Sequence, residues 1–255
     1  MEQKLAERCP NCGSPYFRPL DCAHVRHYAE CCQCGTAWDA LTGEQIPGDV
    51  KDCAQIYRHR EPLSEEERQH FAKSFEAFFV RLGMDMHQPG TMETPLRFVD
   101  AMIAATDGYD GDPKIRVLFD NECRNGCGHD QIVESPIQFF SLCEHHVLPI
   151  KGRVHIGYVP GETIMGLSKL TRIVRVTAKR FTSQERMGYQ IADILQKIVK
   201  SKGVAVLIMA EHFCTQMRGV HEVGAVTTTI QWQGRYEQET ELRQAFFNIV
   251  RVGTS

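Results

Sequence analysis

A Cys-Glu-His-His segment at residues 143–146 and a His-Phe-Cys segment at residues 212–214 combine side chains that bind metals and move protons. Two thiols and one imidazole suit a borderline-soft divalent ion such as zinc, and three protein ligands leave a fourth position open for water. The spacing lets a turn bring Cys143 and His146 to one ion. The spacing also predicts that His212 and Cys214, two residues apart, share one face of a strand. The sequence therefore predicts an open metal site.

The two segments hold more donors than one ion needs. An imidazole titrates near neutral pH and can both take and give a proton. His145 and His212 are therefore candidate proton carriers beside the metal. A lone histidine such as His155 is more often a structural residue, and we interpret it as one.

Size and composition indicate a globular protein of one or two domains, with 255 residues and 42% hydrophobic content. No apolar run reaches the roughly 20 residues that span a bilayer, and the first residues are polar, so we expect no membrane segment and a cytoplasmic location. The formal charge of −3 gives no general attraction to nucleic acid. Eleven cysteines are present, and six of them lie between positions 9 and 34, which favours metal binding over a disulfide scaffold.

Two Cys-x-x-Cys-Gly units near the start are typical of a zinc ribbon. Their cysteines are the predicted ligands of a structural Zn²⁺: Cys9, Cys12, Cys31 and Cys34. A redox dithiol is the competing interpretation. Residues 1–60 carry seven Lys or Arg against eight Asp or Glu, so nucleic acid is an unlikely partner, and a structural role or a protein partner is favoured. We predict a ribbon domain over residues 1–50 and a linker over residues 51–63.

The remaining residues, 64–255, form the predicted catalytic domain. It opens with a capping box, in which Ser64 and Glu67 satisfy free amides at a helix start, and Gly83 ends that helix. An aromatic stripe at helical spacing is predicted to be core. Its members are Phe71, Phe75, Phe78, Phe79 and Leu82. A second helix is expected from Thr94 to about Ala105, with proline in its first turn.

Four β-rich segments and two helical segments follow. The strands are expected at residues 132–140, 153–159, 204–210 and 226–232, and the helices at residues 168–180 and 182–200. This order predicts an α+β fold, with an antiparallel four-stranded sheet and helices on one face. Because such a sheet leaves edges and a face uncovered, we expect a homo-oligomer.

Ordered short motifs run along this second domain. They are Ser141-Leu142-Cys143-Glu144-His145-His146, Gly152, Tyr158-Val159-Pro160, Gly166-Leu167-Ser168-Lys169, Arg172, Gln184-Glu185-Arg186, His212-Phe213-Cys214 and Arg218-Gly219-Val220. Together they resemble GTP cyclohydrolase I over roughly residues 65–250. The resemblance implies the tunnelling fold, in which subunit sheets join into an oligomeric barrel, commonly a decamer with active sites between subunits. It also implies conversion of GTP and water into 7,8-dihydroneopterin triphosphate and formate.

The resemblance assigns roles around the metal. Cys143, His146 and Cys214 would hold a catalytic Zn²⁺ that lowers the pKa of bound water and supplies a nucleophile to the guanine ring. His212 would pass protons to the opening imidazole ring, with assistance from His145.

The same resemblance assigns the substrate contacts. Glu185 would accept from the guanine N–H donors and reject adenine, and its neighbour Gln184 is placed in the same pocket. Three cations would hold the triphosphate: Lys169, Arg172 and Arg218. Arg97 would reach in from a neighbouring subunit, and Ser168 would lie beside the ribose.

Several alternatives stay open. Glu185 could merely cap a helix in a capping box with Thr182. The cations of the helix expected at residues 168–180 could form a solvated face: Lys169, Arg172, Arg175 and Lys179. Another tunnelling-fold enzyme would need a three-histidine metal site or a nucleophilic cysteine without metal. A nonenzymatic zinc adaptor is the alternative from a different class. Cys123 and Cys127 are interpreted as incidental loop residues, and the product can serve folate, other pterin or 7-deazaguanine synthesis.

Overall fold

The computed structural model describes residues 17–22, 25–31, 37–39, 62–116, 118–121 and 131–252. In the predicted ribbon, strands β1 (Phe17–Cys22), β2 (Val25–Cys31) and β3 (Ala37–Asp39) form an antiparallel sheet in that order. Cys9, Cys12 and Cys34 lie outside the described residues, as do Cys123 and Cys127, and Cys31 is described only as the last backbone position of β2. The ribbon zinc site and its domain boundaries therefore stay predictions.

The sheet that positions the candidate site has the order β10-β9-β6-β5-β8. Its long members run antiparallel: β5 (Ile132–Cys143), β6 (Pro149–Val159), β9 (Gly203–His212) and β10 (Val226–Gly234). These are the four predicted strands, so the α+β class and the antiparallel sheet are confirmed. A short fifth strand, β8 (Phe181–Thr182), pairs in parallel with the end of β5. Both β5 and β9 are longer than predicted and end inside the metal-binding segments.

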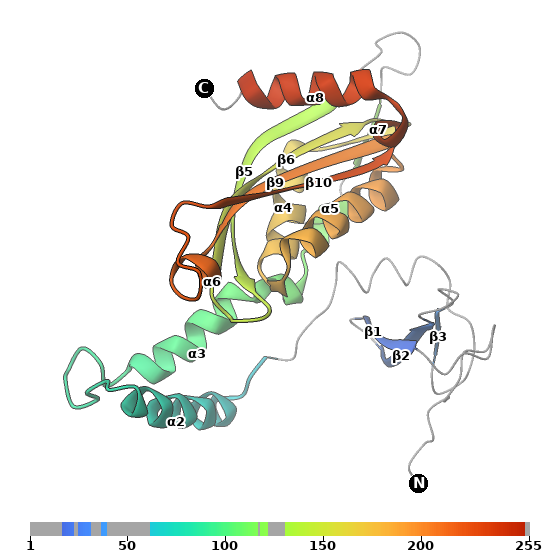
Figure 1. The fold of residues 1–255 in the computed structure, drawn as a ribbon. Coiled ribbons are helices and arrows are strands. Elements are labelled where there is room, and N and C mark those ends of the chain that lie inside the picture. Colours follow the sequence, from blue (N-terminus) through green and yellow to red (C-terminus); the bar gives the residue numbers. More distant parts are fainter. Residues whose placement is uncertain are drawn as a thin grey trace.

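Helices α4 (Leu167–Ala178) and α5 (Gln184–Val199) cover one face of this sheet (Figure 1). Both begin and end within four residues of their predicted bounds. Their apolar faces pack on inward-facing residues of β5, β6 and β9, and side chains such as Leu170, Ile191 and Val206 are fully buried there. This packing holds the start of α5 against the ends of β5 and β9.

A second apolar layer lies on the opposite face. Helices α7 (Arg235–Gln238) and α8 (Thr240–Val252) place Tyr236, Phe246 and Val250 against residues of β6 and β9. The sequence interpretation did not include this layer, although α8 has one apolar face. No helix within the described ranges combines the length and hydropathy needed to cross a membrane.

Close strand contact explains Gly152 of β6. A Cβ added to Gly152 would lie 2.4 Å from the carbonyl oxygen of Met209 on β9. Only glycine therefore allows this approach of the two strands.

The short elements β4 (Leu118–Asp120) and β7 (Thr163–Met165) pair with each other. Two 3-10 turns, η1 (Asp107–Asp110) and η2 (Pro113–Arg116), precede them.

Helices α2 (Glu65–Arg81) and α3 (Thr94–Ala105) form a pair that extends away from the sheet (Figure 1). The capping box at Ser64 is confirmed, since its hydroxyl accepts from the N–H of Glu67 and the Glu67 carboxylate accepts from the N–H of Ser64. Phe75 and Phe79 pack on Phe98 of α3.

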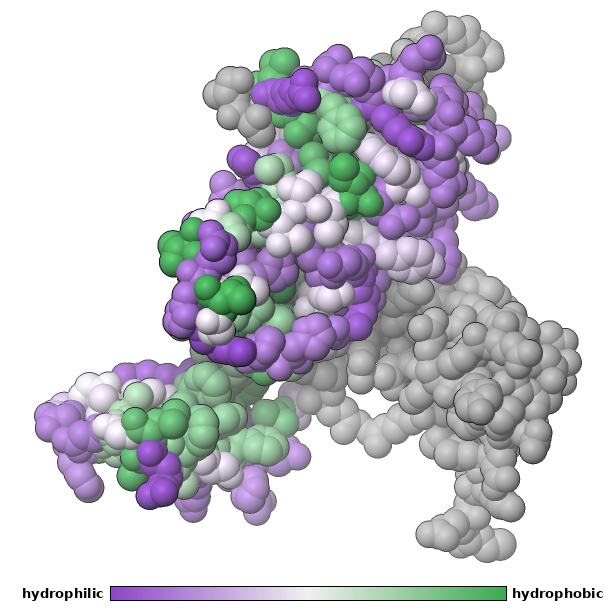
Figure 2. Space-filling view, in the orientation of Figure 1, coloured by the Kyte–Doolittle hydropathy of each residue, from purple (hydrophilic) through white to green (hydrophobic). Residues whose placement is uncertain are grey.

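The prediction that the whole aromatic stripe is core is wrong for the single chain. Phe71, Phe78 and Leu82 are 41%, 57% and 70% exposed. Hydrophobic side chains gather over the α2–α3 pair in Figure 2. Helical spacing identified the apolar face correctly, but α3 is too narrow to cover it.

Candidate active site

The three predicted catalytic zinc ligands come together from two chain segments. Strand β5 ends at Cys143, and the following turn returns so that the N–H of Val147 donates to the Cys143 carbonyl at 2.8 Å. Strand β9 ends at His212, and Cys214 lies in the short helix α6 (Phe213–Gln216). The prediction that His212 and Cys214 share one face of a strand is therefore wrong, because the backbone turns into a helix between them. The donor atoms of Cys143, His146 and Cys214 still lie within 4.8 Å of one another.

This donor set fits a zinc ion. Ligand atoms at about 2.0–2.3 Å from a tetrahedral zinc lie roughly 3.3–3.8 Å apart. The distance from Cys143 Sγ to His146 Nδ1 is 3.8 Å. Burial raises the pKa of the Cys214 thiol, and the neighbouring Cys143 raises it further. Two thiols that oppose each other's ionisation form a site that a cation would stabilise.

His145 differs from His146 in its surroundings. Its Nδ1 also lies 3.8 Å from Cys143 Sγ, yet His145 is not part of the group that includes Cys214. Its side chain is largely exposed, and its Nε2 lies 3.9 Å from the Glu144 carboxylate. This position leaves the His145 ring available to exchange protons beside the metal ligands.

His212 is held from behind by the first residue of α5. Its Nε2 lies 2.8 Å from Oε1 of Gln184, whose side chain is only 2% exposed. Burial lowers the pKa of His212, and the negative charge of Glu185 partly offsets that effect. The buried Gln184 amide is thus engaged inside the protein, so its geometry fits support of His212 better than the predicted contact with substrate.

Glu185 is exposed in the first turn of α5. The N-cap of this helix is Ser183, whose hydroxyl accepts from the N–H of Arg186 at 3.3 Å, while the Thr182 hydroxyl donates to the Ser183 carbonyl instead. The capping box between Thr182 and Glu185 is therefore not formed. Glu185 has no capping role, and its carboxylate is free to meet a ligand near His212.

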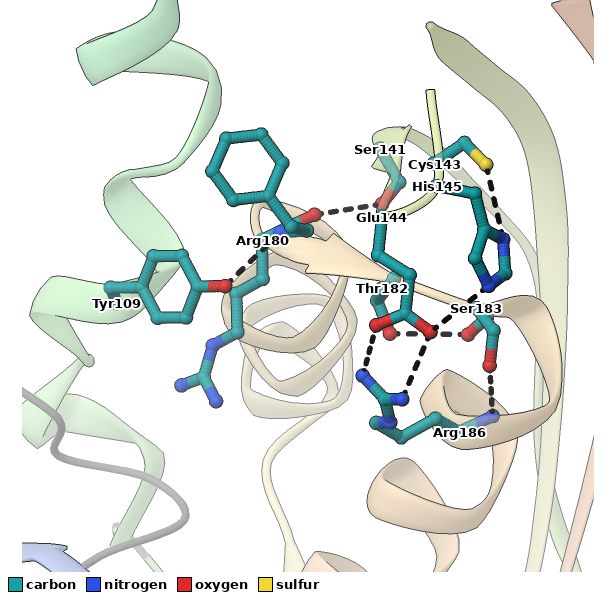
Figure 3. A network of polar contacts seen from close by, with 10 residues as sticks. Tyr109, Ser141, Cys143, Glu144, His145, Arg180, Thr182, Ser183 and Arg186 are labelled. Atoms are coloured by element: carbon teal, nitrogen blue, oxygen red, sulfur yellow. Dashed lines mark hydrogen bonds and ion pairs between the residues drawn. The ribbon is translucent and has the colours of Figure 1, made fainter. Parts of the chain in front are cut away.

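An ion pair that the sequence interpretation missed joins the two motifs. The two terminal guanidinium nitrogens of Arg186, Nη1 and Nη2, donate to the Glu144 carboxylate at 2.5 and 2.9 Å (Figure 3). This bidentate pair connects the turn that carries His145 and His146 to the first turn of α5. Glu144 and Arg186 both stand in motifs that were recognised, but only the structure pairs them.

The pairing of β8 with β5 brings the same two segments together through the backbone. Cys143 lies opposite Thr182, and the N–H of Glu144 donates to the Thr182 carbonyl at 3.2 Å. One step earlier, the Ser141 hydroxyl donates to the Arg180 carbonyl at 3.3 Å (Figure 3). A two-residue strand therefore links the metal ligands to the start of α5.

The predicted triphosphate contacts come from two parts of the chain. Lys169 and Arg172 are in α4, and Lys169 Nζ lies 3.4 Å from the hydroxyl of Ser168. Arg172 donates to the Asp112 carboxylate at 2.6 Å, a pairing that no sequence signal indicated. Arg218 follows α6, is exposed, and is close enough to Cys214 to lower its pKa against the stronger effect of burial.

Arg97 stands apart from these residues in the single chain. Its guanidinium donates to the Glu93 carboxylate at 2.6 Å and to the Gly90 carbonyl at 3.4 Å, both within the α2–α3 part of the chain. No contact with the other predicted site residues is recorded among the described residues. Its expected role in a neighbouring subunit's site stays a prediction.

Comparison with known proteins agrees with this geometry. The sequence profile described as GTP cyclohydrolase I matches residues 71–251, which include every described site residue named above. The chain belongs to the GTP cyclohydrolase I family. The resemblance inferred from the motifs is thereby confirmed, as is the expectation of an enzyme of this type. The predicted ribbon lies outside the matched residues.

Relatives named GTP cyclohydrolase 1 match most of the chain. The protein from Campylobacter curvus is 36% identical over 180 residues, covering 71% of this chain and 94% of the relative. That from Dictyostelium discoideum is 36% identical over 210 residues, covering 82% and 90%. That from Porphyromonas gingivalis is 39% identical over 186 residues, covering 72% and 91%. Among solved structures, the archaeosine synthase QueF-Like in the apo form is 12% identical, with a TM-score of 0.35 over 41% of this chain and 94% of that chain.

Proposed function

We propose that this member of the GTP cyclohydrolase I family converts GTP and water into 7,8-dihydroneopterin triphosphate and formate at the centre built on Cys143, His146 and Cys214. The observation that carries the proposal is the convergence of these three donors from two distant segments, beside His212 and Glu185. When bound, zinc would supply the Lewis acidity that brings the pKa of water close to neutrality. The protein residues then have three tasks: to select guanine, to hold the triphosphate and to move protons.

Glu185 is the proposed guanine reader. Its exposed carboxylate lies in the first turn of α5, where the helix N-terminus favours negative charge. A carboxylate can accept from the two adjacent N–H donors of guanine, and the edge of adenine would leave it unpaired. Since Ser183 caps the helix, the Glu185 carboxylate is not used as the cap.

The triphosphate is assigned to Lys169, Arg172 and Arg218, with Ser168 beside the ribose. Lys169 and Arg172 project from α4, and Arg218 follows the helix that carries Cys214. Arg172 uses one nitrogen for Asp112, which leaves other N–H donors of its planar fork for phosphate oxygens. In the family assembly Arg97 would complete this set from another subunit.

Proton transfer is assigned to His145 and His212. His212 is partly buried and held by Gln184, whereas His145 is exposed beside Glu144. One histidine with a fixed ring and one with solvent access can together deliver a proton and exchange it with water. Opening of the imidazole ring and loss of formate both require such transfers.

The activity test is direct. Purified zinc-loaded protein given GTP should release formate and form a fluorescent pterin, whereas ATP should give neither product. Cys143→Ala should abolish both products and remove the catalytic zinc. If wild-type protein with full zinc occupancy released no formate from GTP, the proposed function would be wrong.

The assembly and the ribbon are part of the same proposal. We expect a homo-oligomer, specifically a decamer, in the cytoplasm, with GTP as substrate. Binding of a protein partner is the favoured role for the ribbon.

Metal analysis should find about two zinc ions per chain under the two-site interpretation. A double substitution, Cys9→Ser with Cys12→Ser, should remove one ion and leave formate release intact. Retention of both ions would contradict the ribbon zinc site.

A further inference from the structure

The amide of Gln184 can adopt only one orientation. Its Nε2 lies 3.2 Å from the Ile208 carbonyl, 3.1 Å from the Thr227 carbonyl and 3.0 Å from the Thr229 hydroxyl. Backbone carbonyls only accept hydrogen bonds, so the NH₂ end must face them. The reversed amide would place its oxygen against two carbonyl oxygens, with which it cannot form a hydrogen bond.

This orientation determines which nitrogen of His212 carries hydrogen. The Oε1 atom of Gln184 must point at His212 Nε2, 2.8 Å away, and an amide oxygen can only accept. A neutral imidazole has one N–H, so that hydrogen must lie on Nε2 and the lone pair must lie on Nδ1.

The other ring nitrogen is free to react. Within the described part of the chain, Nδ1 of His212 makes no hydrogen bond and is not buried, so it keeps contact with solvent. Gln184, which is itself held by carbonyls of β9 and β10, therefore contacts the His212 ring at Nε2 and leaves Nδ1 open.

We propose that Gln184 is a positioning residue that holds His212 as the Nε2–H tautomer, so that the unprotonated Nδ1 is the ring atom presented to substrate. The Nε2–H bond to Gln184 is kept while substrate binds. The proposal rests on the proposed role of His212 as a proton carrier, and it replaces the predicted contact of Gln184 with substrate.

The tautomer can be measured without any change to Gln184. Zinc-loaded, full-length wild-type protein would be labelled with histidine carrying ¹⁵N only at Nδ1. Its spectrum at a pH where the ring is neutral would be compared with that of His212→Asn, which identifies the His212 signal. We expect the chemical shift of an unprotonated nitrogen. A protonated Nδ1 in the wild-type protein would overturn the proposal, whether or not any variant folds.

Kinetics of Gln184→Met test the positioning role. Methionine fills similar volume but cannot accept from His212, so the Nδ1 signal should shift toward a mixture of tautomers. We expect kcat to fall by about tenfold or more, bounded by the roughly 10⁴-fold cost of a wrong tautomer in a Ser-His-Asp triad. The KM for GTP should change little, because the buried side chain does not reach substrate. Gln190→Met, on the same helix, is the matched control and should retain the wild-type kcat.

These experiments distinguish a failure of the positioning role of Gln184 from a failure of the proposed function. A raised KM with unchanged kcat would make Gln184 a substrate contact and would refute the positioning role. If formate is released but Nδ1 carries the hydrogen, only this inference fails. If no formate is released from GTP, the proposed function fails, and the nitrogen shift still decides the tautomer.

Discussion

His145 and His146 are adjacent in sequence and equally distant from the Cys143 thiol, yet their surroundings differ. Each places Nδ1 3.8 Å from Cys143 Sγ. Only His146 also has its donor within 4.8 Å of the Cys214 thiol, so it alone can complete the three-ligand group. His145 instead faces Glu144 and solvent. The two rings should therefore separate metal binding from proton transfer.

Substitution of each histidine tests this division. His146→Ala should lose the catalytic zinc and all formate release, because two thiols alone leave the ion under-coordinated. His145→Ala should keep the zinc and lower kcat by about a hundredfold, the typical cost of a missing general acid or base. Zinc content and kcat measured on both variants check the expectation. Loss of zinc from His145→Ala would instead make His145 a ligand.

A sequence motif can predict which residues gather at a site. It cannot predict hydrogen bonds between residues that lie far apart in the sequence. Residue type and spacing, together with the family resemblance, predicted the group of Cys143, His146 and Cys214, whose donor atoms the structure brings together. For Glu185 the sequence left a helix cap and a substrate contact open, and the structure removes the first of these by placing Ser183 at the N-cap. The sequence interpretation gave Gln184 a substrate contact and could not show its hydrogen bonds to carbonyls of β9 and β10, because these lie 24 and 43 residues away.

At the element scale, two junctions hold the site together. The end of β5 meets the start of α5 through the short parallel strand β8 and through the pair of Glu144 with Arg186. Both connections fix the turn that carries His146, the predicted metal-binding histidine. Because metal affinity depends on groups that orient the ligands, the ion pair should contribute to zinc binding.

Arg186→Met tests that contribution. The variant keeps the side-chain length and removes both donors to Glu144, so the turn becomes freer. We expect zinc affinity to fall by about tenfold, measured by competition with a chelator. Arg175→Met, an exposed arginine on α4, is the matched control. Equal zinc affinity in the two variants would show that the ion pair does not support the metal site.

A second junction joins α4 to the segment before β4. Burial alone would raise the pKa of Asp112, but hydrogen bonds from Arg172 and from the N–H of Lys114 hold that pKa below its usual range. The unfolded chain therefore binds a proton at higher pH than the folded chain. The stability from this pair is present above the ordinary aspartate pKa and is lost as pH falls through the lowered folded value.

Asp112→Asn should reveal this pH dependence. At pH 7 the variant should unfold more easily by about 1 kcal/mol, a modest value because the pair is partly exposed. The difference from wild type should shrink as pH falls below about 4. Chemical denaturation at several pH values measures it, with Glu76→Gln on α2 as a neutralisation control. A gap independent of pH would mean that the Asp112 charge is not the cause.

Periodicity predicted the elements well because their apolar faces are regular. All four long strands and the helices α2 to α5 were expected at nearly their observed positions. The errors lie at element ends and in short pieces. Strand β9 stops at His212 because the chain turns into α6, a four-residue helix too short to show a period. Strand β8 has only two residues and forms through pairing with β5 rather than through local preference.

At the scale of the whole molecule, the single chain leaves apolar surface uncovered. Phe71, Phe78 and Leu82 on α2 are exposed. Strand β10 is the last strand of its sheet, so its outer edge has no partner strand in the described part of the chain. Sequence periodicity shows that a face is apolar but not which chain covers it. Exposed edges and apolar faces of this kind favour association.

A charge placed on the stripe tests whether α2 lies in a subunit interface. Phe78 is 57% exposed in the chain alone, so Phe78→Asp should fold, but burial of the new carboxylate in an interface would be unfavourable. We expect light scattering to show a smaller assembly and formate release to fall with it, because the proposed assembly places active sites between subunits. Ala77→Asp is the matched control, since Ala77 is also exposed and about 140° from the stripe centre at 100° per residue. An unchanged assembly for Phe78→Asp would mean that the stripe stays open to solvent or is covered by another part of the same chain.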